Sequence, residues 1–144
     1  SASIPVASRP VKLGGKRLLD GGVSDPIPVK WMLSRGYEKN VVVLTRDVKY
    51  RKKANPKMQL FLKAVLHKYP AFLKDLEERH IHYNETLEEL ASLEKEGRIH
   101  IIRPSSPIQA AMIERDESNL ERIYQTGRAD MKKDLEKLKA YLDS

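Results

Sequence analysis

The sequence Val41-Val42-Val43-Leu44-Thr45 is an uncharged and mostly β-branched run in a chain of which 33% is charged. A strand with one face in water alternates apolar and polar residues, whereas a strand covered on both faces is apolar at every position. The run therefore predicts a strand that is covered on both faces, as in a parallel α/β sheet.

A second apolar run lies at residues 98–103 and has the sequence Arg-Ile-His-Ile-Ile-Arg. Two helical patterns lie between the runs, at residues 58–69 and at residues 71–96, and Gly97 ends the second pattern. Strand, helices and strand in this order predict a crossover that joins two parallel strands.

Upstream of the first strand, the sequence predicts a β-hairpin. Val11-Lys12-Leu13 and Arg17-Leu18-Leu19 flank the pair Gly14-Gly15. Two glycines between two short strand-like runs are typical of a two-residue hairpin turn, because such a turn needs positive φ angles.

A short helix of about two turns is expected between Asp25 and Gly36. Asp25 precedes Pro26 and is interpreted as the helix cap rather than as a second catalytic acid. Trp31 and Met32 lie on this helix, and we expect them to belong to the core rather than to a lipid-contacting edge.

The C-terminal residues 119–143 predict an amphipathic helix. Its apolar stripe steps by three and four residues and consists of Leu120, Tyr124, Gly127, Met131, Leu135, Leu138 and Leu142. Glycine lowers helix propensity by ~1 kcal/mol relative to alanine. We therefore expect Gly127 to mark close packing against a neighbouring element.

These strands make a very small sheet for a chain of 144 residues. A central strand without neighbours on both sides would bury unpaired N–H and C=O groups, at a cost of ~1–3 kcal/mol each. We therefore expect further strands to come from another chain or from a segment outside this sequence.

Charge and composition exclude several classes of protein. The chain has 27 Lys+Arg and 20 Asp+Glu, and the excess of positive charge lies in residues 1–56. The absence of Cys excludes disulfide scaffolds, thiol catalysis and Cys-ligated metals, and no apolar run reaches the ~18 residues of a membrane span. A basic half is typical of proteins that bind nucleic acid, an anionic membrane or an acidic protein.

The strongest local signal for function is Asp20-Gly21-Gly22, at the end of the second hairpin strand. A carboxylate at this place can project into a crevice at the sheet edge, and glycine lets the backbone approach a ligand closely. Asp-Gly is also common in plain turns, which is the alternative interpretation.

The longer string Asp20-Gly21-Gly22-Val23-Ser24-Asp25-Pro26-Ile27-Pro28-Val29 resembles the second active-site block of the patatin-like phospholipases. The stretch Ser1-Ala2-Ser3-Ile4-Pro5 resembles an Ala/Ser-rich stretch that precedes the hairpin in that family. Later segments are similar to the bacterial branch of the family: Gly36-Tyr37, the strand at residues 41–46, Ile101-Ile102-Arg103-Pro104 and Tyr124-Gln125-Thr126-Gly127.

The resemblance implies a three-layer α/β/α sandwich that hydrolyses lipid or phospholipid esters with a Ser-Asp dyad, without cofactor or metal. Asp20 would be the dyad carboxylate, in a motif formed by Asp20, Gly21 and Gly22. It would accept the proton of a serine hydroxyl as that hydroxyl attacks the ester carbonyl, with no His in between.

This sequence departs from the family pattern because it contains neither a Gly-x-Ser-x-Gly nucleophile motif nor the Gly-rich oxyanion loop. Both are expected upstream of Ser1, in a missing N-terminal half of the same domain. Residues 1–144 would then be the C-terminal portion of a single patatin-like domain, with residues 105–144 as a helical extension. This portion is expected to be inactive alone. We expect a cytoplasmic protein, with peripheral contact at the inner membrane face as an option.

Two further groups of residues suggest a binding role. His80 and His82, with His67 and His100 elsewhere, suggest a metal site, but residues two apart on a helix do not share a face, so we expect no metal. The segment Lys49-Tyr50-Arg51-Lys52-Lys53 could contact anionic headgroups. A solvated loop is the favoured interpretation of that segment.

Two other functions stay open beside hydrolysis. One is a basic binding module without catalysis, which would bind an anionic membrane or a nucleic acid. The sequence contains no recognisable nucleic-acid motif and only 6% aromatic residues, so we do not expect nucleic acid as the partner. The other is a non-catalytic scaffold in which Asp20-Gly21-Gly22 is only a turn.

Overall fold

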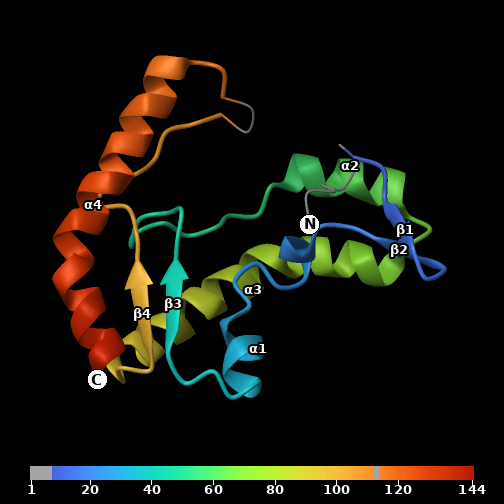
Figure 1. The fold of residues 1–144 in the computed structure, drawn as a ribbon. Helices are drawn as coiled ribbons and strands as arrows, with labels where there is room; N and C mark the ends of the chain where they lie inside the picture. Colours follow the sequence, from blue (N-terminus) through green and yellow to red (C-terminus); the bar gives the residue numbers. More distant parts are fainter. Residues whose placement is uncertain (1–7, 112–113) are drawn as a thin grey trace. The chain divides into compact units, whose positions relative to one another are not determined.

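The structure, a computed structural model, describes residues 8–111 and 114–144. It is mixed α/β, with 54% helix and, in the described residues, two sheets of two strands each, which confirms the general α/β class. The stretch at residues 1–5 that resembles the patatin-like family lies outside the described residues. The chain divides into two compact units (Figure 1): the first holds Lys52–Leu87 and the residues before Val29, and the second holds Val29–Arg51 and Glu88–Ser144.

The first unit contains the predicted hairpin. Strand β1 (Val11–Leu13) pairs antiparallel with β2 (Lys16–Leu18), and Val11 lies opposite Leu18. Gly14 and Gly15 have φ angles of 56° and 75°. A two-residue turn with positive φ at both positions matches the right-handed twist of the strands, which explains why glycine stands at both.

Two helices complete the first unit. Helix α2 (Pro56–Leu66) begins after Asn55, whose side chain accepts the backbone N–H of Met58, so this helix starts two residues before the predicted position. Helix α3 (Pro70–Lys95) follows and continues into the second unit. It ends at Lys95, and Gly97, with a φ of 73°, stops the helix as the sequence predicts.

The second unit is built on a parallel strand pair. Strand β3 (Asn40–Val43) pairs with β4 (Ile99–Ile102), and Asn40 lies beside Ile99 in register. The backbone N–H of Leu44 continues the ladder by donating to Ile102 O at 2.8 Å. The predicted parallel pairing of these two runs is therefore confirmed.

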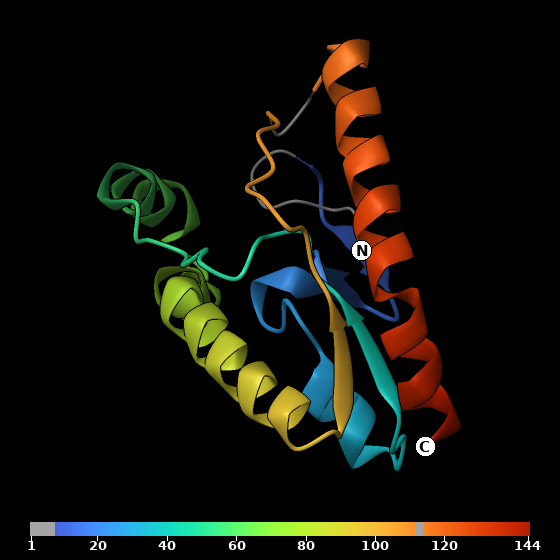
Figure 2. The ribbon, with the colours of Figure 1, turned by 90° about the vertical axis from the view of Figure 1, so that its left-hand side faces the viewer.

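The sheet of the second unit has helices on both faces (Figure 2), with α4 (Glu117–Asp143) on one face and the last turns of α3 on the other. Ile99 and Ile101 are buried and alternate along β4 with residues that face α4, because side chains alternate between the faces of a strand. Leu90 and Leu93 of α3 are also buried and complete this core.

The coverage of β3 differs from the prediction. Val41 and Val43 are 41% and 69% exposed, so the described residues do not cover this strand on both faces. The register places both valines beside His100 and Ile102 on the α4 side of the sheet. Helix α4 packs against β4 and leaves the neighbouring strand open on this side.

Helix α1 (Val29–Ser34) starts later than predicted, and the prediction of Asp25 as its N-cap was wrong. The reason lies in Pro28, because a proline disfavours helical geometry at the residue before it and the helix can begin only after Ile27. The end of the helix is as predicted, since Gly36 follows with a φ of 84°. Trp31 is 53% exposed, with the Arg35 guanidinium 5.0 Å from its ring, so its assignment to the core was also wrong.

Helix α4 is amphipathic, but only Met131 and Leu138 of its apolar stripe are half-buried. Leu120, Tyr124 and Leu142 are exposed, and a side chain at Gly127 would meet no atom within 4 Å, so the prediction of close packing at Gly127 was wrong. The side of the helix that packs on β4 also carries Asp134 and Tyr141. Asp134 of this side lies 2.5 Å from His100 Nε2.

The C-terminal turn of α4 is held to the sheet by Tyr141. Its hydroxyl accepts the backbone N–H of Asn40 at 2.8 Å and donates to the carbonyl of Arg98 at 3.0 Å, so it bridges the starts of both strands. Lys39 Nζ donates to the carbonyls of Tyr141 and Leu142 at 3.0 and 2.9 Å. A cation at the C-terminus of a helix is favourable because it meets the negative end of the helix dipole.

We predict that Tyr141→Phe lowers the free energy of unfolding by about 1–3 kcal/mol, because it leaves the N–H of the buried Asn40 without its partner. Urea denaturation followed by circular dichroism measures the change. Tyr124→Phe removes the same hydroxyl from an exposed ring on the same helix and should change stability by less than about 0.5 kcal/mol. Equal midpoints for the two variants would show that the bridge is not stabilising.

Candidate functional site

Asp20 lies two residues after the last hairpin residue, Leu18, and caps a short turn of 3-10 helix, η1 (Gly21–Val23). Its Oδ1 accepts the backbone N–H of Gly22 at 2.7 Å, and the side chain is half-buried. Aspartate is favoured at such a cap because its oxygen pairs an N–H that would otherwise have no partner. The turn interpretation of Asp20-Gly21-Gly22 therefore describes the backbone correctly, and the carboxylate is held at a defined place.

The turn is fixed to α3 by a long-range bond. Arg79 Nε donates to the carbonyl of Gly22 at 2.9 Å, and Val23 of the turn is buried. A Cβ at Gly22 would lie 3.1 Å from Asp20 Oδ1, which is closer than ordinary contact, whereas a Cβ at Gly21 would meet nothing within 4 Å. Of the two glycines, Gly22 is thus the one that the carboxylate position requires.

A cavity of about 210 Å³ opens beside Asp20. Its walls come from the hairpin end, the turn and α3, and they consist of Arg17, Leu18, Leu19, Asp20, Gly21, Val23, Ser24, Phe72 and Asp75. Asp75 adds a second carboxylate to this cavity. No signal in the sequence points to Asp75, because it lies in the middle of a helical pattern without a motif.

A larger apolar cavity of about 330 Å³ lies in the same unit. It is lined by Ser8, Pro10, Arg17, Leu19, Val65, Leu66, Tyr69 and Phe72. Three residues, Arg17, Leu19 and Phe72, line both cavities, so the carboxylate cavity and the apolar cavity share a wall. Arg17 Nη1 donates to the Tyr69 hydroxyl at 2.9 Å in this wall.

Ser24 is the serine that lines the cavity of Asp20, but its hydroxyl is used in the turn. Ser24 Oγ donates to the carbonyl of Gly21 at 3.3 Å rather than to the carboxylate. The exposed Asp25 next to it does not line this cavity. The structure therefore brings Asp20, Gly21 and Gly22 together as one turn and joins them to Phe72, Asp75 and Arg79, which sequence reasoning did not identify.

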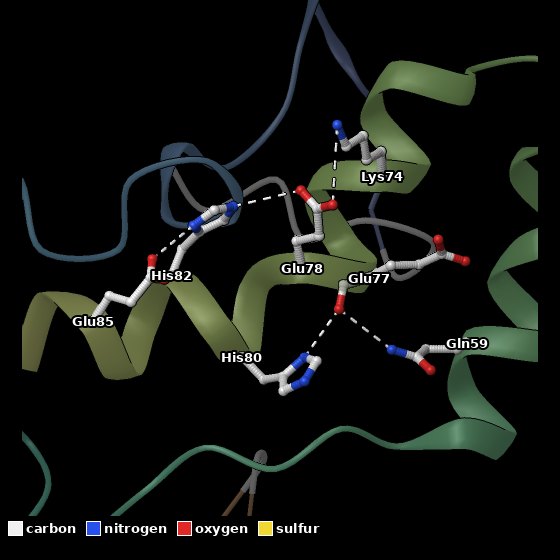
Figure 3. Close-up of polar contacts among 7 residues, drawn as sticks. All are labelled: Gln59, Lys74, Glu77, Glu78, His80, His82 and Glu85. Carbon is white, nitrogen blue, oxygen red and sulfur yellow. Dashed lines mark hydrogen bonds and ion pairs between the residues drawn. The ribbon is translucent and has the colours of Figure 1, made fainter.

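The two histidines of α3 do not form a metal site. His80 Nδ1 lies 2.9 Å from the carbonyl of Glu77, whereas His82 lies between Glu85 and Glu78, and Figure 3 shows that the two rings point in different directions. In residues 8–111 and 114–144, no group of three His, Cys, Asp or Glu side chains could hold a metal ion.

A second histidine contact lies in the other unit and was not predicted. His100 pairs with Asp134 and stacks on the Tyr141 ring, with 5.6 Å between the ring centroids. The pair is half-buried where β4 meets α4. It joins the sheet to the helix and lies outside the cavities described above.

The basic segment at residues 49–53 is partly occupied by internal contacts. Arg51 donates to the carbonyls of Val48 and Tyr50, and Lys52 Nζ lies 5.4 Å from the centroid of the Tyr83 ring. These contacts take up two of the four cations of the segment. In the part of the chain that the structure describes, no helix combines the length and the apolar character needed to cross a bilayer.

Comparison with known families gives a match for the second half of the chain. Residues 69–143, from the start of α3 to the end of α4, match the family described as a domain of unknown function (DUF6363). The match covers more than half of the chain. The chain belongs to the DUF6363 family.

The DUF6363 match begins after the Asp20 turn, so it contains Phe72, Asp75 and Arg79 but not the carboxylate that they surround. The DUF6363 description assigns no activity to the matched residues. Comparison with curated proteins and with solved structures gives no match.

We predict that His82 titrates above its ordinary pKa of 6.5, because hydrogen bonding to Glu85 raises the pKa and Glu78 adds to the effect. The raised pKa means that the contact stabilises the fold below the ordinary value and that this contribution is lost as the pH rises through the folded value. NMR titration of the imidazole proton measures the midpoint. Glu85→Gln should lower it, whereas Glu88→Gln, an exposed control on the same helix, should leave it unchanged. Equal midpoints in all three proteins would contradict the assignment.

Proposed function

We propose that this chain contributes the carboxylate of a Ser-Asp pair to a lipid acyl hydrolase of the patatin-like type. The observation that carries the proposal is the position of Asp20, held by the Gly22 N–H in a cavity that shares a wall with an apolar cavity. A carboxylate beside an apolar chamber suits an ester whose acyl part is hydrocarbon. The serine nucleophile and the oxyanion donors lie, in this proposal, outside residues 1–144.

Asp20 has the chemistry that the proposed role needs. One of its oxygens, Oδ1, is held by the Gly22 N–H, and in the described residues Oδ2 makes no hydrogen bond. Oδ2 can therefore accept the proton of a serine hydroxyl as the serine oxygen attacks the ester carbonyl and forms a C–O bond. When the C–O bond to the alcohol then breaks, the same proton passes from Oδ2 to the leaving oxygen, which gives the acyl-enzyme and the free alcohol. The fixed turn holds the base in place before the substrate arrives, which lowers the entropic cost of the reaction.

The apolar cavity supports an ester of a hydrophobic acid as the substrate. Its volume of about 330 Å³ lies in the lower range of ligand pockets, which is roughly 300–1,000 Å³. Leu19, Leu66 and Phe72 supply apolar surface that a hydrocarbon chain would cover. The substrate class of the proposal is accordingly a lipid or phospholipid ester.

The wider architecture and location follow from the same proposal. In this proposal, the last turns of α3, the pair β3–β4 and α4 would be the layers of a three-layer α/β/α sandwich, and β3 would receive a further strand on its open edge. The basic charge of the chain suits a cytoplasmic enzyme that contacts an anionic membrane from one side. Catalysis needs no metal or cofactor in this scheme.

We predict that Asp20→Asn in the full-length protein lowers hydrolysis of a short-chain p-nitrophenyl ester by about 10²–10⁴-fold, which is the usual contribution of a general base. Asparagine keeps an oxygen that can accept the Gly22 N–H, so the turn and the fold should survive. Asp25→Asn is the matched control, because Asp25 is an exposed carboxylate outside the cavity. Retained activity in Asp20→Asn, or no labelling of the wild type by a fluorophosphonate probe, would refute the proposal.

A second prediction tests whether the rate depends on the position of the Asp20 carboxylate and not only on its presence. Gly22→Ala places a Cβ 3.1 Å from Asp20 Oδ1 and should displace the carboxylate by a few tenths of an ångström. We expect kcat to fall by up to about 10²-fold, since rates depend steeply on the alignment of reacting groups. Gly21→Ala, with open space at its Cβ, should keep kcat close to the wild-type value. Equal kcat values would show that Gly22 does not position the base.

A further inference from the structure

Helix α2 exposes large apolar side chains. Leu60 is 72% exposed and Phe61 is 50% exposed, and no residue of the helix is buried. Leu60, Phe61 and Ala64 recur at the three- and four-residue spacing that puts side chains on one side of a helix. An exposed apolar patch of this kind marks a surface that binds a partner or a membrane.

The other side of α2 is held by α3, which determines which side faces outward. Gln59 Nε2 donates to the carbonyl of Glu77 at 3.3 Å, and Lys63 Nζ pairs with the Glu77 carboxylate at 3.0 Å. Leu62 and Leu66 lie on the same side as these contacts and are half-buried. The outer face of α2, defined here as Lys57, Leu60, Phe61 and Ala64, is turned away from α3.

The charge around the outer face of α2 has one sign. No Asp or Glu occurs between Val48 and Lys74 in the sequence. Lys53 and Lys57 precede the apolar residues and Lys68 follows them, and all three side chains are exposed. Among the described residues, none of these three lysines makes an ion pair. The apolar residues are thus flanked at both ends by cations.

Helix α4 provides a comparison within the same chain. It also exposes apolar residues, including Leu135 and Leu142. Its acidic and basic residues are equal in number, with ion pairs such as that of Lys139 with Glu136. An anionic surface would therefore attract α2 and not α4, although both helices expose apolar side chains.

We infer that the outer face of α2 docks on the surface of an anionic phospholipid membrane. The helix would lie in the plane of the interface, with Leu60 and Phe61 among the acyl chains and Lys53, Lys57 and Lys68 at the headgroups. A helix with apolar residues on one side and lysines around them is typical of interfacial binding. The helix has only 11 residues, so binding should be reversible and sensitive to salt.

Charge and side-chain type together favour a membrane over other occupants. Nucleic acid would pair its phosphates with the lysines and stack its bases on aromatic rings, but it would leave aliphatic side chains such as Leu60 in water. A second copy of the chain would bring the same lysines into contact with each other. A bilayer of anionic lipid accepts both the apolar residues and the cations.

The test measures binding of the full-length protein to vesicles by co-flotation. Vesicles of phosphatidylcholine and phosphatidylglycerol should bind the protein at low salt, and pure phosphatidylcholine vesicles should bind it much more weakly. High salt should release it from the anionic vesicles. Failure of the wild type to bind anionic vesicles would overturn the inference.

Two variants test the outer face itself. Leu60→Ser with Phe61→Ser should weaken binding to anionic vesicles at least about tenfold, because both apolar side chains are lost. Lys57→Gln with Lys68→Gln should weaken it about 25-fold, given about fivefold for each lysine near an anionic surface. Circular dichroism verifies that each variant is folded.

Matched controls on α4 separate the surface from general effects of charge and polarity. Leu135→Ser with Leu142→Ser, and Lys132→Gln with Lys137→Gln, make the same chemical changes on exposed positions and should keep wild-type binding. Loss of binding in both helices alike would overturn the assignment to α2. If only the lysine variant lost vesicle binding, and if the wild type bound duplex DNA as tightly as anionic vesicles, the partner would be nucleic acid instead. Dissociation of a dimer by the serine variant, without vesicle binding by the wild type, would indicate a second copy.

The docking surface adds a membrane contact to the proposed function. It rests on the proposed function only in the claim that the bound lipid is also the substrate. The two can fail separately. Asp20→Asn should bind vesicles like the wild type while losing hydrolysis, and the Leu60→Ser, Phe61→Ser variant should hydrolyse a soluble short-chain ester normally. Vesicle binding without any esterase activity would refute the enzyme and keep the docking surface.

Discussion

Strands β3 and β4 run parallel, and this constraint determines the path of the rest of the chain. Parallel strands cannot be joined by a tight turn, so the chain must return to the starting end of the sheet before the second strand begins. Helices α2 and α3 make this return. The last turns of α3 bury Leu90 and Leu93 near the sheet, and its earlier turns carry Phe72, Asp75 and Arg79 to the Asp20 turn. One helix therefore contributes to both units.

The Asp20 turn combines a local device with a long-range one. The cap between Asp20 and Gly22 is made by neighbouring residues and would form in many contexts. The bond from Arg79 comes from a residue 57 positions away and ties the turn to a helix. Capping does not compete with the proposed catalytic role, because the cap uses Oδ1, whereas Oδ2 makes no hydrogen bond to the residues that the structure describes.

The exposed apolar side chains of α2 and α4 differ in the charges that lie beside them. On α4, Asp134 pairs with His100 of β4, and Asp130 accepts the N–H of Ser105 beyond that strand, which lowers the pKa of the Asp130 carboxyl. The helix that carries this apolar stripe has equal numbers of acidic and basic residues. On α2 the apolar residues lie in a stretch of sequence, from Val48 to Lys74, that contains lysines but no Asp or Glu. The exposed apolar side chains of α2 therefore suggest contact with an anionic membrane, whereas those of α4 do not.

The sequence by itself determined the elements that depend on neighbouring residues: the hairpin with its two glycines, the two parallel strands, the three long helices and the glycine ends of α1 and α3. Only the tertiary structure decided what each face meets. It exposed Trp31 and Gly127, moved the start of α1 beyond Asp25, and surrounded Asp20 with residues of α3. The reason is physical: caps, turns and periodicity act over a few residues, whereas burial and cavity walls depend on segments that are far apart in the chain.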